Sequence, residues 1–103
     1  MEINLPRITL GIMIVWMSKP KLFVKEGCPW CVDALNYFKL KSVSLDIIDV
    51  RKDPTQMNEL LKVSGQSMTP TLQNGDFVVA DFDIQEFEDA MSKNPQEAAK
   101  LGF

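Results

Sequence analysis

The sequence contains no histidine, and its two cysteines both lie in one tetrapeptide, Cys28-Pro29-Trp30-Cys31. A structural zinc site needs four ligands, so this chain could complete one only together with a second subunit. Two cysteines so close together also enclose too short a loop to stabilise a fold as a disulfide. We therefore expect no metal, and we expect a chemical role for the pair in the cytoplasm, where cysteines are kept reduced.

The chain also lacks an excess of basic residues and a long apolar run. Its 11 Lys and Arg residues stand against 14 Asp and Glu residues, and the resulting formal charge of −3 argues against a nucleic-acid partner. One apolar stretch, residues 8–17, is much shorter than the roughly 20 residues that a membrane-spanning helix needs. No cluster of Lys and Arg indicates a membrane surface as a partner.

The 103 residues suffice for one compact domain. Residues 1–17 carry no chemical motif, and three interpretations stay open for them: an added β-strand, a loose tail, or an upstream start codon that precedes Met17 as the natural first residue. They make a poor secretion signal, because Glu2 offsets Arg7 and no small-residue cleavage pattern follows. We divide the chain into an N-terminal extension, 1–17, and a domain, 18–103.

Hydrophobic patterning and turn signals predict the order β-α-β-α-β-β-α. The predicted strands are 21–25, 44–50, one that starts with 69–72, and 77–80. Helices are predicted after Cys28, after Asp53-Pro54 and from Ile84, and Asn94-Pro95-Gln96-Glu97 is typical of a capping box on a short last helix. A strand–helix–strand start implies a parallel crossover, and Asn74-Gly75 indicates a hairpin. The fold class is therefore α/β, a four-stranded mixed sheet flanked by helices.

The cysteine pair lies at the junction of a predicted strand and a predicted helix. A sulfur at a helix N-terminus faces unpaired backbone N–H groups and the positive end of the helix dipole, and both favour the thiolate. The thiolate is the nucleophile in disulfide exchange. We therefore expect the pKa of Cys28 to lie below the ordinary thiol value of about 8.5, whereas Cys31, one turn further into the helix, stays protonated.

With these features the chain resembles a glutaredoxin, a member of the thioredoxin-fold family. The matching segments are Lys25-x-x-Cys28-Pro29-Trp30-Cys31, Thr69-Pro70, Asn74-Gly75 and Asp81-Phe82-Asp83. The resemblance implies a thioredoxin-like fold and a glutathione-dependent thiol–disulfide oxidoreductase. It further implies glutathione as the reductant and disulfide-containing proteins as substrates, and we expect a monomer.

The resemblance also assigns roles to single residues. Cys28 matches the nucleophile and Cys31 the resolving cysteine, while Pro70 matches a proline that is cis in this fold. Residues matching the glutathione site are Lys25 for a carboxylate, Trp30 in place of the family's usual tyrosine, the Thr69-Pro70 backbone, the N–H groups of Asp81 and Phe82 for the γ-glutamyl carboxylate, and Asp83 for the ammonium. From the residues alone, Lys25 could equally be a solvated lysine, and Asp81 and Asp83 could be helix caps.

One segment departs from the family pattern. Val79-Ala80 stands where glutaredoxins usually have Gly-Gly. Glycines let a ligand approach the backbone closely. Phe82 stands where an aspartate is common. Three alternatives to a glutathione-dependent enzyme therefore stay open. They are a dithiol redoxin reduced by a flavoprotein reductase, a dimer that carries an iron–sulfur cluster through Cys28 and glutathione, and a redox-controlled binding module.

Overall fold

The structure is a computed structural model that describes residues 19–103, so the interpretations of residues 1–17 lie outside the described residues. The chain runs β1–α2–β2–α3–β3–β4–α4–α5. The strands are β1 (Lys21–Val24), β2 (Asp46–Asp49), β3 (Thr71–Asn74) and β4 (Phe77–Val79), and the helices are α2 (Pro29–Leu40), α3 (Pro54–Ser64), α4 (Ile84–Lys93) and α5 (Pro95–Leu101). This order confirms the predicted sequence of strands and helices.

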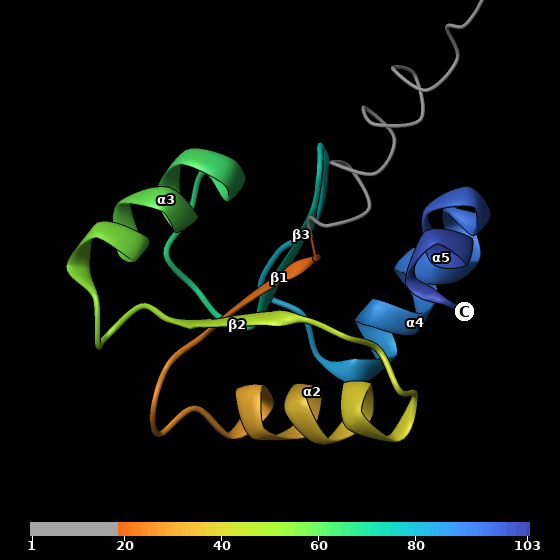
Figure 1. Cartoon of the computed structure of the whole chain (residues 1–103), viewed down its shortest axis with the longest axis horizontal. Coiled ribbons are helices and arrows are strands. Elements are labelled where there is room, and N and C mark those ends of the chain that lie inside the picture. Colours follow the sequence, from red (N-terminus) through yellow and green to blue (C-terminus); the bar gives the residue numbers. More distant parts are fainter. Residues whose placement is uncertain (1–18) are drawn as a thin grey trace, which may run out of the picture.

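The strands form one mixed sheet in the order β2-β1-β3-β4 (Figure 1). β1 pairs with β2 in parallel, as the predicted crossover requires, and the pairings β1–β3 and β3–β4 are antiparallel. The predicted hairpin is present, because Asn74 pairs with Phe77 across the turn at Gly75, whose φ is 62°.

Two predicted strands begin later than expected, each for a local reason. β2 begins at Asp46, the residue whose N–H donates to the Pro20 carbonyl at the start of β1 (2.8 Å). β3 begins at Thr71, because the preceding Pro70 has no N–H to donate to a neighbouring strand.

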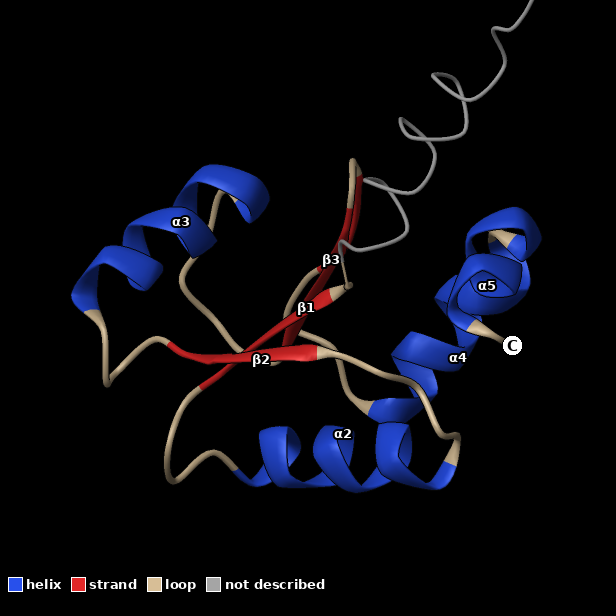
Figure 2. Cartoon of the chain, viewed as in Figure 1, coloured by secondary structure: helices blue, strands red, loops and turns tan. Residues whose placement is uncertain are grey.

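Helices cover both faces of the sheet (Figures 1 and 2). On one face, α2, α4 and α5 pack over a core that includes Leu22 and Leu72 of the central strands. On the other face, Leu60 of α3 packs against Phe23 and Val50. Of the helices that the structure describes, none is long and apolar enough to cross a membrane.

Capping residues fix where α3 and α4 begin. The Asp53 carboxylate accepts the Thr55 N–H, as predicted for α3 (3.0 Å). A capping box exists, but it lies on α4, where Asp83 accepts the Glu86 N–H and the Glu86 carboxylate accepts the Asp83 N–H. The box predicted at Asn94 was wrong, because Asn94 Nδ2 donates to the Ala90 carbonyl and so closes α4 instead.

Candidate active site at the start of helix α2

Cys28 is the residue that opens α2. The loop after β1 turns at Gly27, whose φ of 82° is natural for glycine, and this turn places Cys28 at the helix N-cap. Cys28 Sγ accepts a hydrogen bond from the Cys31 N–H at 3.2 Å. The sulfur thus occupies the position that a side-chain oxygen takes in an ordinary cap, facing the N–H groups at the start of the helix.

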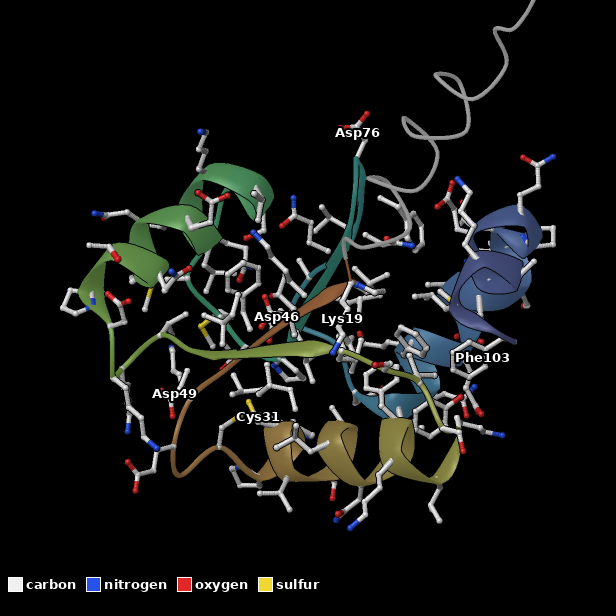
Figure 3. The ribbon with its side chains drawn as sticks, viewed as in Figure 1. Lys19, Cys31, Asp46, Asp49, Asp76 and Phe103 are labelled. Carbon is white, nitrogen blue, oxygen red and sulfur yellow. The ribbon has the colours of Figure 1, made fainter. Side chains whose placement is uncertain are left out.

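The second cysteine lies on the buried face of the same helix turn. Cys31 is 2% exposed, whereas Cys28 is partly exposed. Figure 3 shows Cys31 on the side of α2 that faces the sheet. The two thiols lie in direct contact and are not joined by a disulfide. A substrate can therefore reach Cys28 first, and Cys31 lies in position to attack Cys28 from the buried side.

Thr69 brings the loop before β3 against the Cys28 sulfur. The peptide bond between Thr69 and Pro70 is cis, as expected. Thr69 Oγ1 donates toward Cys28 Sγ at 3.8 Å, and the Cys28 S–H donates toward the Thr69 carbonyl at 3.7 Å. The Thr69 carbonyl accepts a hydrogen bond only from the neutral thiol, whereas the Thr69 hydroxyl can also donate to the thiolate.

These contacts separate the two thiols by their pKa values. Burial works against a thiolate at Cys28, but hydrogen bonds from Cys31, Thr69 and Trp30 outweigh it and hold the pKa of Cys28 below its ordinary value. At Cys31, burial raises the pKa, and so does the hydrogen bond that this thiol shares with Cys28. The first thiol therefore ionises more easily than the second, in the expected direction.

A pocket of about 160 Å³ lies in front of Cys28. It is lined by Lys25, Glu26, Gly27, Cys28, Pro29, Trp30, Arg51, Met68 and Thr69. Two of its side chains, Trp30 (58% exposed) and Met68 (49% exposed), are large apolar groups open to solvent. The pocket therefore offers apolar contact area together with the cationic side chains of Lys25 and Arg51.

Arg51 and Met68 are pocket residues that the sequence interpretation missed. Arg51 Nη1 donates to the Glu26 carbonyl at 3.0 Å and so ties the segment after β2 to the loop before Cys28. A usable signal existed for this residue: β1 and β2 are parallel, so the segments after their carboxyl ends meet at one edge of the sheet. For Met68 no comparable signal exists beyond its place next to Thr69.

Comparison with known proteins agrees with this geometry. A family model described as Glutaredoxin matches residues 21–78, which is more than half of the chain. The chain belongs to the glutaredoxin family. Family membership and the paired cysteines together imply a thiol redox function.

Three relatives show how widely the likeness extends. An uncharacterized glutaredoxin-like 8.6 kDa protein of the rubredoxin operon of Clostridium pasteurianum is 25% identical over 71% of this chain and 97% of its own length. A mutant of the thioredoxin-like protein BC3987 is 30% identical over 74% of this chain and 97% of its own, with a TM-score of 0.64. A glutaredoxin from Archaeoglobus fulgidus is 18% identical over 85% of this chain and 94% of its own length, with a TM-score of 0.63, and shows the same fold.

In this glutaredoxin, the segment expected to hold the γ-glutamyl end of glutathione makes contacts within the chain. The Asp81 N–H donates to Thr71 Oγ1 at 3.3 Å, and the Phe82 N–H donates to the Pro70 carbonyl at 3.2 Å. The Asp83 carboxylate caps α4. These residues lie in the segment that follows β4, and their contacts with glutathione stay predictions.

The backbone of this segment differs from what the Gly-Gly comparison implies. Val79 is an ordinary β4 residue that pairs with Leu72. The left-handed conformation that glycine favours occurs instead at Asp81, with φ 51°. The Phe82 side chain is 2% exposed and belongs to the core, where an aspartate could not be placed without burying a charge.

The acidic side chains and cysteines that the structure describes do not gather into a metal site. Residues 19–103 contain no group of three or more His, Cys, Asp or Glu side chains that could hold a metal ion. The observed donor set near Cys28 is the Cys31 thiol with the backbone and hydroxyl groups of its neighbours. That set suits proton and electron exchange at sulfur.

Proposed function

We propose that this glutaredoxin is a dithiol thiol–disulfide oxidoreductase that reduces protein disulfides and glutathione mixed disulfides. The observation that carries the proposal is the unequal pair of thiols at the N-terminus of α2. Cys28 is partly exposed with a lowered pKa, and Cys31 is buried with a raised pKa. An attacking thiol and a resolving thiol need these opposite properties.

The reaction follows from the positions of the two sulfurs. The Cys28 thiolate attacks one sulfur of the substrate disulfide, which forms a mixed disulfide and releases the other substrate sulfur as a thiolate that takes up a proton. Cys31 then loses its proton and attacks Cys28 Sγ, which breaks the mixed disulfide and releases the second substrate thiol. Two electrons have passed to the substrate, and the enzyme holds a Cys28–Cys31 disulfide.

The pocket supports a peptide or glutathione as the group next to the reacting sulfur. Trp30 and Met68 offer apolar contacts, and Lys25 can meet a carboxylate. Two molecules of glutathione would restore the dithiol: the first forms a mixed disulfide with Cys28, and the second releases glutathione disulfide.

One observation favours a second electron source, a flavoprotein reductase. The N–H groups of Asp81 and Phe82, which the glutathione model needs for a carboxylate, already donate within the chain. Leaving charge-assisted hydrogen bonds unmade would cost roughly 1.5–3 kcal/mol each, or about one to two decades of affinity. A reductase would instead contact the exposed surface around Trp30 and would not need this binding site.

A coupled assay tests both proposals. The reduction of a protein disulfide is followed with NADPH and either glutathione plus glutathione reductase or thioredoxin reductase. We expect turnover with at least one system and none for Cys28→Ser. Absence of turnover with both, in a protein whose thiols are free, would contradict the enzymatic proposal and favour the binding module.

The Cys31→Ser variant separates the two substrate classes. Cys28 alone can exchange with a glutathione mixed disulfide, because a second glutathione can resolve the intermediate. A protein disulfide requires Cys31, so the variant should accumulate a covalent mixed disulfide with such a substrate. Wild-type and variant rates that match on protein disulfides would contradict the resolving role of Cys31.

A further inference from the structure

Thr71 lies at the centre of a partly buried hydrogen-bond network behind the active site. The residue is fully buried at the start of β3. Its hydroxyl donates to the Met68 carbonyl at 2.9 Å, and it accepts the Gln66 Nε2–H at 3.2 Å and the Asp81 N–H at 3.3 Å. A hydroxyl has one donor and two acceptor positions, so all of its hydrogen-bonding capacity is used.

Each of these three partners belongs to a segment that shapes the site. The Met68 carbonyl is joined by its peptide bond to Thr69, whose own carbonyl and hydroxyl contact the Cys28 sulfur. Gln66 holds the same loop from its other end, because its Oε1 accepts the Met68 N–H at 2.6 Å. The third partner, Asp81, lies in the segment between β4 and α4.

We propose that Thr71 is a positioning residue, whose hydroxyl sets the placement of Thr69 against Cys28 and of the Asp81 backbone. This inference rests on the proposed disulfide exchange for its effect on turnover. The positioning role itself does not depend on that activity, because it concerns the hydrogen bonds that Thr69 makes with the Cys28 sulfur. The Thr71 hydroxyl bonds Met68, Gln66 and Asp81 and so acts on the Cys28 sulfur through Thr69.

Removing the Thr71 hydroxyl should make the Cys28 thiol harder to ionise. Thr71→Val keeps the branched shape but leaves the Met68 carbonyl, the Gln66 amide and the Asp81 N–H without this partner. Released from it, Thr69 can move away from Cys28, and the thiolate then loses a hydrogen bond that favours it.

The test compares Thr71→Val with Thr71→Ser in the full chain. The rate of Cys28 alkylation by iodoacetamide is measured against pH, together with kcat/KM for a protein disulfide. For Thr71→Val we expect the alkylation profile to move to higher pH and kcat/KM to fall about tenfold, the effect of one buried hydrogen bond. Thr71→Ser retains the hydroxyl and should keep both readouts within about twofold of the wild type.

Two further variants guard against a purely structural effect. Tyr37→Phe also removes one hydroxyl, which donates to the Glu88 carboxylate at 3.2 Å between α2 and α4, near the C-terminal end of α2 and away from its N-cap Cys28. It should leave the Cys28 alkylation profile unchanged. If Thr71→Val does not fold, Gln66→Ala at a half-buried position removes one donor to the Thr71 hydroxyl together with the Gln66 acceptor of the Met68 N–H, and it should move the profile in the same direction.

The outcomes distinguish this inference from the proposed function. A folded Thr71→Val protein with a wild-type alkylation profile would overturn the positioning role, whatever its turnover. A wild-type protein that shows no turnover would contradict the proposed function, yet the alkylation comparison would still decide the role of Thr71. An equal shift in Tyr37→Phe would mean that any lost hydroxyl has this effect, and it would also overturn the inference.

Discussion

The two ends of helix α2 differ in nearly every physical property. The N-terminal end carries the partly exposed Cys28 and the exposed Trp30, and hydrogen bonds hold its sulfur in place. The C-terminal end carries Phe38, which is buried among aromatic rings, with Phe87 at a centroid distance of 4.9 Å and a near-perpendicular angle of 88°. One helix therefore supplies chemistry at one end and stability at the other.

This separation has a physical reason. A nucleophile must meet solvent and substrate, so few apolar contacts can be made around it. The aromatic cluster at the other end removes large apolar surfaces from water, and edge-to-face pairs add further stabilisation. Phe82 joins this cluster at 5.1 Å from Phe87, which links the segment after β4 to the stable end of the helix. We expect changes at one end to leave the other largely unaffected, because Cys28 and Phe38 lie about 15 Å apart along the helix axis.

The largest expected effect is the loss of activity in Cys28→Ser. A serine hydroxyl does not form the thiolate that attacks a disulfide, so the rate of disulfide reduction should fall to the uncatalysed background. The denaturation midpoint should stay near that of the wild type, because Cys28 is partly exposed and outside the aromatic cluster. Residual turnover that depends on Cys31 would contradict the assignment of the nucleophile.

At the C-terminal end of α2, Phe87 of α4 packs on Phe38. Phe87→Ala should lower the free energy of unfolding by about 3–5 kcal/mol, as expected for a fully buried phenylalanine. Denaturant unfolding measures the loss. Phe103→Ala is the matched control, because Phe103 stacks on Tyr37 at the rim of the cluster and is 38% exposed, so its loss should cost less. If Phe87→Ala still folds but shifts the alkylation profile of Cys28, the two ends are coupled and the comparison fails.

The two thiols should titrate separately. Because hydrogen bonds lower the pKa of Cys28, the midpoint of its alkylation profile should lie below that of an ordinary thiol, and Cys31 should react only at higher pH. Because the pKa of Cys28 is lower in the folded than in the unfolded protein, its thiolate stabilises the fold at pH values above the pKa of the unfolded state. This stabilisation is lost as the pH falls through the pKa of the folded state. Alkylation against pH in the two single Cys→Ser variants measures the ionisation of each thiol separately. The same profile for Cys28 and Cys31 would contradict the division of roles.

The smallest expected effect concerns Asp83 at the start of α4. Asp83→Ala removes half of the capping box and should cost about 1 kcal/mol of unfolding free energy. Asp33→Asn, at an exposed position of α2, is the control and should change stability little. The KM for glutathione in Asp83→Ala shows whether this carboxylate also contacts the ligand: an unchanged KM would leave the cap as its role.

Local signals explain most of what could be predicted. The helix starts at Pro29 and Pro54, the hairpin at Asn74-Gly75 and the placement of Cys28 before a helix each depend on residues within a few positions of one another. The cis bond at Pro70 was expected from the family resemblance and is present. The capping box at Asn94 failed because two helices compete for one residue, and sequence spacing does not say which helix wins.

The amino-acid sequence by itself determined the chemistry and the order of elements: a lone pair of thiols at a helix start, in a chain without histidine or a further cysteine, on an α/β fold. Only the tertiary structure decided which groups surround that chemistry. Arg51 reaches the pocket because β1 and β2 run parallel, and Phe82 points into the core instead of toward a ligand. Thr71 joins three segments through one hydroxyl, and such a bond depends on distances that no local pattern encodes.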